Sequence, residues 1–330
     1  MLSGLGGACA RPKGVLFDSS PSRVWPAPPE PPRVRLVGTL SGSDDLKAAR
    51  SGREAFQAAL RGPLPPIHFL GPHGVALRDL DLLAVADANG AAVHIIDLEA
   101  RSHCKISGWA EQRFGAPVGV AWAGDRLFVT DAQRHEVVEL NASGAFRRGF
   151  GQDALQRPVG IAYVKERERL YVVDGGAHCL KVFDLDGTEA GTLGRNGTGP
   201  GEFNFPTHIC ARDGTLLVAD SGNSRVQLLD LDGECLRTIG RRGDGAGDFA
   251  LPKGVAFDSD GHLYVVDAHF ENVQIFDREG RLLLAVGEEG SGPGEFSLPA
   301  GIAIDGQDRI WVADSGNGRM QVLEYLKAEL

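Results

Sequence analysis

Short apolar runs separated by turns rich in glycine and aspartate recur along most of the chain. Each unit begins with Pro-x-Gly-(Val/Ile)-Ala, continues into a second apolar run that ends in Asp, and adds a third that ends in a large apolar residue and an acid. The runs lack the 3.6-residue period of an amphipathic helix, so they predict β-strands. The aspartates that end the second runs lie 43 to 47 residues apart: Asp87, Asp131, Asp174, Asp220, Asp267 and Asp314.

A repeat of about 45 residues built from strands and tight turns is typical of a four-stranded propeller blade. In the fourth copy the pattern predicts an innermost strand over residues 207–211 and further strands over 216–219, 226–230 and 235–240. Asx-Gly pairs between these runs favour the tight turns of β-hairpins. The six copies therefore predict an all-β chain folded as a six-bladed β-propeller.

The sixth copy has no outer strand, because its third run ends near Tyr325 and the chain ends at Leu330. Residues 33–40 have the same pattern as the outer strand at residues 235–240. We therefore expect them to pair with the last blade and close the ring, which protects sheet edges that would otherwise aggregate.

These patterns divide the chain into four segments: an N-terminal proline-rich arm (1–32), the closing strand (33–42), a helical insertion (43–65) and the propeller (66–330). One or two short helices are expected in the insertion, because Ser43 is a candidate N-cap followed by acids and Gly62 is a stop signal. Their buried face would hold Leu46, Phe56 and Leu60.

Proline donates no ladder hydrogen bond, so residues 24–34 are expected to lie as an extended arm on the propeller, with an SH3-type ligand as the alternative.

Two segments resemble NHL repeats. They are Leu-Val-Ala-Asp-Ser-Gly-Asn-Ser-Arg-Val-Gln-Leu-Leu-Asp at residues 217–230 and Ile-Trp-Val-Ala-Asp-Ser-Gly-Asn-Gly-Arg-Met-Gln-Val-Leu at 310–323. The Asn and Arg that follow the aspartate are missing from the first three copies. The resemblance implies an NHL-type six-bladed propeller, and the Trp-Pro-x-Pro-Pro-Glu arm is similar to arms of bacterial envelope NHL proteins.

The first residues place small side chains directly before Cys9, which resembles the end of a bacterial lipoprotein signal. The apolar region of such a signal is short here, since it contains only Leu2 and Leu5. The resemblance predicts a lipid anchor at Cys9 and a location at the bacterial cell envelope or periplasm. The alternative is a cytoplasmic chain with a chance cysteine.

A formal net charge of −10 opposes binding to nucleic-acid phosphates. We therefore expect no nucleic-acid partner. The other expectations are a protein or peptide partner, membrane contact only through an anchor at Cys9, and a monomer. The 42% content of hydrophobic residues is that of a globular chain with a substantial core.

Functional positions are sought where one blade differs from the others, because the six repeated aspartates are expected to accept turn amides and not to perform chemistry. The variable residue of the Pro-x-Gly motif should lie near a mouth of the central channel. It reads His73, Val118, Val159, Thr207, Lys253 and Ala300 around the ring. His208 replaces the motif glycine in the fourth copy, and His269 and Phe270 replace part of a Ser-Gly-Asn turn. The candidate ligand or partner residues are His73, Thr207, His208, Lys253, His269 and Phe270.

No Gly-x-Ser-x-Gly, His-Glu-x-x-His or phosphate-loop motif occurs, so no catalytic residue and no cofactor are assigned. The leading hypothesis is a non-enzymatic scaffold that binds a protein or peptide. The alternative is a metal-dependent lyase or hydrolase at the channel mouth, in which His73, His208 and His269 would bind zinc, since catalytic zinc sites use three protein ligands and water.

Overall fold

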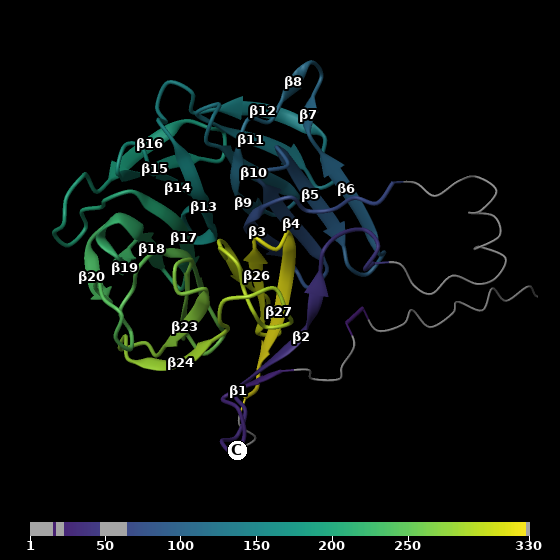
Figure 1. Ribbon diagram of the computed structural model, residues 1–330. Helices are drawn as coiled ribbons and strands as arrows, with labels where there is room; N and C mark the ends of the chain where they lie inside the picture. The colour runs from purple at the N-terminus through teal and green to yellow at the C-terminus, as the bar shows by residue number, and fades with distance from the viewer. Residues whose placement is uncertain (1–15, 18–22, 47–64, 328–330) are drawn as a thin grey trace, which may run out of the picture.

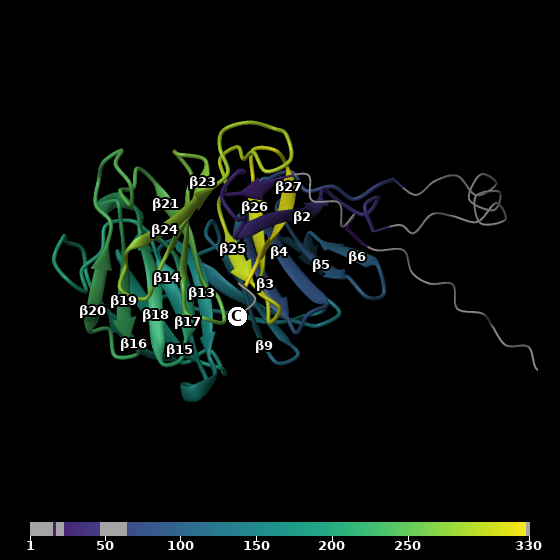
Figure 2. The same cartoon turned by 90° about the horizontal axis from the view of Figure 1, so that it is seen from below.

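The computed structural model describes residues 16–17, 23–46 and 65–327, and it forms the predicted six-bladed β-propeller (Figure 1). Six antiparallel sheets surround a central axis, and Figure 2 shows their strands from the side. Blade 1 contains β3 (Pro72–Arg78), β4 (Leu82–Asp87), β5 (Ala92–Asp97) and β6 (Ser102–Ile106); blade 2 contains β9 (Pro117–Ala123), β10 (Arg126–Asp131), β11 (Glu136–Asn141) and β12 (Phe146–Phe150); blade 3 contains β13 (Pro158–Val164), β14 (Arg169–Asp174), β15 (Cys179–Asp184) and β16 (Glu189–Leu193).

The last three blades repeat the same order of strands. Blade 4 contains β17 (Pro206–Arg212), β18 (Thr215–Asp220), β19 (Arg225–Asp230) and β20 (Cys235–Ile239); blade 5 contains β21 (Pro252–Phe257), β22 (Leu263–Asp267), β23 (Asn272–Phe276) and β24 (Leu282–Val286); blade 6 contains β25 (Ile302–Ile304), β26 (Arg309–Asp314) and β27 (Arg319–Tyr325). A small hairpin of β7 (Gly108–Trp109) and β8 (Gln112–Arg113) follows blade 1, and two 3-10 turns lie at η1 (Lys165–Arg167) and η2 (Ser221–Asn223). The four strands expected in the fourth copy are confirmed as β17 to β20.

The hydrophobic core lies between the blades. The second strand of each blade is buried on both faces, as in β14, because each sheet packs against two neighbours. The buried apolar residues therefore form one cluster at each of the six junctions. Since every blade shares its core with both neighbours, the stability of the ring depends on closure.

Closure by an N-terminal strand is confirmed. Strand β2 (Val34–Leu40) pairs antiparallel with β27, and Figure 1 shows the purple strand beside the yellow one. The pairing shifts register between Leu36 and Gly38, so the two ends of β2 face different junctions. Val34 and Leu36 are buried in the cluster between blades 5 and 6, whereas Leu40 is buried between blades 6 and 1.

The described part of the proline-rich arm lies on blade 6. Strand β1 (Val24–Trp25) pairs with the outer side of β2, and the guanidinium of Arg23 forms an ion pair with Glu288. Most of the expected helical insertion lies outside the described residues, including Phe56, Leu60 and Gly62. Leu46, which was also expected on the buried face of the insertion, is buried against blades 6 and 1.

The glycine of the Pro-x-Gly motif marks the point where inner strands of adjacent blades approach most closely. A Cβ atom at Gly119 would lie 2.2 Å from the carbonyl oxygen of Val159, and one at Gly301 would lie 2.0 Å from that of His73. These distances leave no space for any side chain. The motif therefore contains glycine because neighbouring backbones meet there.

The six repeated aspartates stabilise turns, as expected. All six are fully buried, and the first three show the role most simply. The carboxylate of Asp174 accepts hydrogen bonds from the backbone N–H groups of Gln156, Arg157, Gly176 and Ala177. In blades 4 and 6 the Asn, Arg and Gln of the NHL-like segments donate to the same carboxylate, as Asn223, Arg225 and Gln227 do to Asp220.

Charged side chains connect blades 2 and 3 around the buried Glu139. Arg126 donates to Glu139 from Nε and Nη2 at 2.7 and 2.9 Å, and Arg148 donates from Nε at 2.8 Å. Both guanidinium groups also donate to the carbonyl oxygen of Leu185 in blade 3. Burial raises the pKa of Glu139, but hydrogen bonds and charges from the two arginines outweigh it and lower the pKa to about 2.

Replacement of Glu139 by Gln is expected to reduce the free energy of unfolding at pH 7 by about 3 kcal/mol. The folded pKa is lowered, so the contribution is complete above the unfolded value near 4.5 and is lost as pH falls towards 2. Urea unfolding should therefore show less than half of this difference at pH 3. Glu189→Gln, which removes a partly exposed pair with Lys181, is the control and should cost no more than about 1 kcal/mol. A difference for Glu139→Gln that does not depend on pH would contradict this assignment.

Candidate functional site

The innermost segment of each blade begins at one face of the ring, which we call the proline face. It is defined by Pro72, Pro117, Pro158, Pro206, Pro252 and Pro299, together with the turns that follow the repeated aspartates. The opposite face, at which the inner strands end, is called the far face. Each face has a cavity near the central axis.

A cavity of about 350 Å³ lies at the centre of the proline face. Three of the residues expected at a channel mouth, His73, Thr207 and Lys253, line it together. The expected neighbours Val118 and Val159 also line it, whereas Ala300 is buried and is not part of the lining. Arg157 and Phe205, which the sequence did not single out, complete its rim.

The cavity is electropositive. Burial lowers the pKa of Lys253, and the side chain forms no hydrogen bond or ion pair with any residue in the described ranges. Burial, followed by the charge of Lys253, lowers the pKa of His73 to about 3, so His73 is neutral at physiological pH. The buried Nδ1 of His73 lacks a hydrogen bond of acceptable geometry within the described residues. The cavity thus offers an unpaired ammonium group, whereas the Nδ1 atom of His73 is shielded from solvent.

Thr207 presents an acceptor to this cavity. The hydroxyl of Ser221 donates to the carbonyl oxygen of Pro252, and the Oγ atoms of Thr207 and Ser221 lie 2.6 Å apart. Because the Ser221 proton is used, the hydroxyl of Thr207 donates to Ser221 and keeps its own lone pairs. A ligand N–H group is the complement of such an oxygen.

Four large apolar side chains are exposed on the proline face, and one of them, Phe205, also lines the cavity. Phe205, Leu251 and Leu298 each directly precede the proline of blades 4, 5 and 6, and Leu70 lies one residue earlier in blade 1. Their exposed fractions are 54%, 39%, 57% and 59%. We call these four residues the apolar arc. Exposed apolar groups that recur at nearly the same position of consecutive blades, on one face of the ring, differ from scattered single residues, and exposed apolar surfaces mark interaction sites.

Two residues of the apolar arc have a costly backbone conformation. Phe205 and Leu298 have φ angles of 46° and 45°, in the left-handed region that bulky residues avoid at a cost of about 1 to 2 kcal/mol. Their backbone N–H groups are held by the neighbouring blade, through Nδ1 of His178 at 3.0 Å and Oε1 of Glu271 at 3.2 Å. Glycine or asparagine would fit this conformation more easily, so the retained large side chains point to a role on the surface.

His208 does not line the proline-face cavity. Successive residues of a strand point in opposite directions, so Thr207 and His208 line different cavities. His208 lines a cavity of about 250 Å³ that is open at the far face and contains Trp122, Tyr163 and Phe257. Burial lowers the pKa of His208 to about 4.

His269 and Phe270 lie in the turn between β22 and β23, on the proline face but outside the lining of the central cavity. His269 is exposed, its ring centroid is 5.7 Å from that of Phe270, and both backbone N–H groups donate to Asp267. Within the described ranges, no three His, Cys, Asp or Glu side chains are placed to hold a metal ion. The structure therefore does not bring His73, His208 and His269 together as a zinc site.

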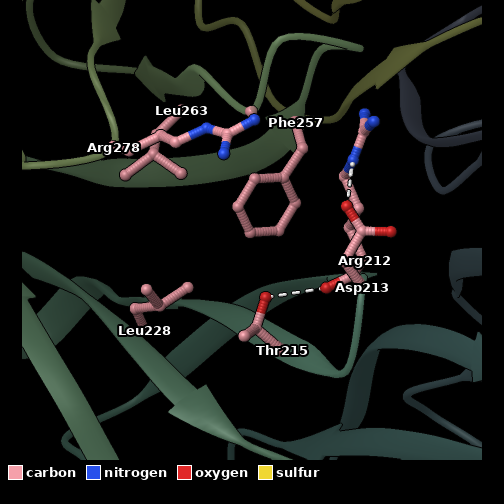
Figure 3. Close-up of a pocket in the computed structure, with 8 residues that line it drawn as sticks. Arg212, Asp213, Thr215, Leu228, Phe257, Leu263 and Arg278 are labelled. Carbon is pink, nitrogen blue, oxygen red and sulfur yellow. Dashed lines mark hydrogen bonds and ion pairs between the residues drawn. The ribbon is translucent and has the colours of Figure 1, made fainter.

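A third recess, of about 210 Å³, lies between blades 4 and 5 (Figure 3). Phe257 and Leu263 line one side and Leu228 the other. Arg212 at its edge donates from Nη2 to the carbonyl oxygen of Ser259 at 3.0 Å, and Thr215 donates to the carbonyl oxygen of Arg212 at 2.7 Å. Because Arg212 bridges the two blades, this recess belongs to the junction between them.

Cys9 lies outside the described residues, so the lipid anchor and the envelope location stay predictions. Among the residues that the structure describes, none belongs to a helix long and apolar enough to cross a membrane.

Two family models match segments of the chain from residue 155 onwards. A model described as an NHL repeat matches residues 155–183 and 203–227, in blades 3 and 4. The chain carries NHL repeats. A model described as a 6-bladed beta-propeller matches residues 257–325 of this NHL propeller, in blades 5 and 6. The resemblance seen in the sequence is therefore confirmed.

One curated relative of the NHL propeller is the protein named brain tumor from Drosophila melanogaster. It is 30% identical over 124 residues, which are 36% of this chain and 12% of that protein. The match thus covers a small part of the relative's length.

Solved structures show the same fold. An auxiliary nutrient binding protein from Bacteroides thetaiotaomicron is 15% identical, with a TM-score of 0.62 over 78% of this chain and 70% of that one. The virginiamycin B lyase from Staphylococcus aureus is 13% identical, with a TM-score of 0.56 over 78% of this chain and 96% of the lyase. At these identities the likeness shows the fold alone.

Proposed function

We propose that the chain is a non-enzymatic scaffold that binds a protein or peptide on the proline face. The apolar arc carries this proposal, because four large side chains are exposed there and two of them keep an unfavourable backbone. Propellers with NHL repeats commonly bind proteins, which agrees with this assignment. The rigid ring holds the loops of several blades in a fixed arrangement, so little ordering is required on binding.

The lyase alternative draws on a shared fold, and a fold hosts many functions. It requires several metal-binding side chains that lie together at the channel mouth. His73 and His208 line two different cavities, and His269 is exposed in an outer turn. This separation favours the scaffold.

Replacement of Leu298 by Asn tests the proposal. Asparagine tolerates the left-handed region, so the variant should be at least as stable as the parent protein in thermal unfolding. Peptides selected on the parent protein from a random displayed library should nevertheless bind at least about tenfold more weakly, since an apolar contact is lost. Fluorescence polarisation with labelled peptides measures the change.

The matched control is Leu236→Asn on β20, the outer strand of blade 4, where the leucine is 53% exposed. It removes an equally exposed leucine away from the apolar arc, and the selected peptides should bind it as they bind the parent. Equal weakening by both substitutions, or by neither, would refute binding at the proline face.

A further inference from the structure

The proline-face cavity contains two cationic side chains and no acid. Lys253 and Arg157 line it, whereas no Asp or Glu is found among its described lining residues. The nearby repeated aspartates are fully buried and accept backbone amides, so they do not pair with Lys253. An acid-free cationic cavity contrasts with the net charge of −10 for the whole chain.

An anion is the complement of this cavity. A partly buried ammonium without a partner is unfavourable, and a carboxylate would supply a charge-assisted hydrogen bond. The other polar groups suit a peptide carboxylate. Neutral His73 lines the cavity without adding a charge, and the free lone pairs of Thr207 can accept the N–H of the residue that bears the carboxylate.

The position of the cavity favours the terminal residue of a bound chain over an internal acidic side chain. It lies on the axis and is walled by the first residues of inner strands from several blades, and its volume of about 350 Å³ exceeds what one acidic side chain fills. A chain end can enter with its last residue. Phe205 belongs both to the cavity rim and to the apolar arc, so residues that precede the carboxylate would pass directly onto apolar surface.

We propose that this cavity receives the C-terminal carboxylate of a peptide or protein, beside Lys253 and Arg157, while the preceding apolar side chains pack on the apolar arc. This inference rests on the proposed function and specifies its partner. RNA fits this site less well. A phosphate backbone is bound by many cationic side chains, whereas this cavity has two, and exposed leucines lie on the same face.

The test uses peptides with random C-terminal sequences, displayed with a free carboxylate and selected on the full chain. Each selected peptide is then synthesised with a free carboxylate and with a C-terminal amide. For the parent protein we expect amidation to weaken binding about tenfold or more, which is the range for a charged hydrogen bond. Lys253→Met should weaken binding of the free acid by a similar factor, and amidation should then have little further effect.

Lys105→Met is the matched control, because Lys105 is exposed on the outer strand β6. It should bind both forms of the peptide as the parent does. Peptides that depend on Leu298 but are indifferent to amidation and to Lys253→Met would overturn the C-terminal site and leave the proposed function standing. Dependence on an internal acidic residue would also overturn it.

Two further outcomes would reject both proposals together. One is a failure to select any peptide. The other is an RNA pool that binds with the same dependence on Lys253 while peptides do not bind.

Discussion

A chain that begins at residue 41 is expected to lose the cooperative thermal unfolding of the full-length protein. Strand β2 contributes Val34, Leu36 and Leu40 to two junction clusters, and each is worth about 2 kcal/mol in buried apolar surface. Its removal also exposes the edge of β27, which then becomes available for pairing with other chains. A loss of this size approaches the whole stability of a domain, about 5 to 15 kcal/mol. Circular dichroism melts and size-exclusion chromatography measure the outcome.

A point substitution tests closure without truncation. Val34→Asp places a charge where the side chain is fully buried, and the free energy of unfolding should fall by more than about 4 kcal/mol. Arg35→Gln alters the next residue, which forms a partly exposed ion pair with Glu324, and should cost at most about 1 kcal/mol. Parent-like melting of Val34→Asp or of the truncated chain would show that the ring does not need β2.

Gly119→Ala is expected to destabilise the ring by more than about 3 kcal/mol, although it adds one methyl group. The new Cβ would lie 2.2 Å from the carbonyl oxygen of Val159, which belongs to the backbone of the next blade and cannot rotate away. The inner strands of blades 2 and 3 would have to separate. Urea unfolding followed by tryptophan fluorescence measures the loss.

Gly191→Ala is the control for that substitution. Gly191 lies in β16, the outer strand of blade 3, and a Cβ atom there would have no neighbour within 4 Å. Its stability should change by less than about 1 kcal/mol, because alanine restricts the unfolded chain without a clash. Similar losses at both glycines would mean that backbone freedom, and not close approach of strands, explains the motif.

The fold could be predicted from the sequence because its signals are local. Apolar runs, Asx-Gly turns and a fixed period specify each blade by itself, and the pattern shared by residues 33–40 and 235–240 identified the closing strand. The chemical reason for the motif glycine was not accessible, because it depends on the distance between the backbones of Gly119 and Val159. That distance is set only when the ring is assembled.

The site could be predicted in part. Comparison of one motif position around the ring identified His73, Thr207 and Lys253, which do share a cavity. His208 was grouped with them because it replaces the motif glycine, although the alternation of side chains along a strand places it in the far-face cavity. His269 lies outside both, because its turn is further from the axis.

The apolar arc was missed because apolar residues in a sequence normally predict burial. A comparison of the residue before each motif proline gives Gly71, Ala116, Arg157, Phe205, Leu251 and Leu298. This series changes from small to large and apolar around the ring, and that change was the available signal. Its exposure became clear only from the structure.

Hydrogen–deuterium exchange of the chain with and without a selected peptide tests the central claim most directly. Binding at the proline face predicts slower exchange around Leu70, Phe205, Lys253 and Leu298, with no change in the far-face turns, since contacts and reduced local opening protect amides. Protection confined to the far face, or to the recess between blades 4 and 5, would contradict it.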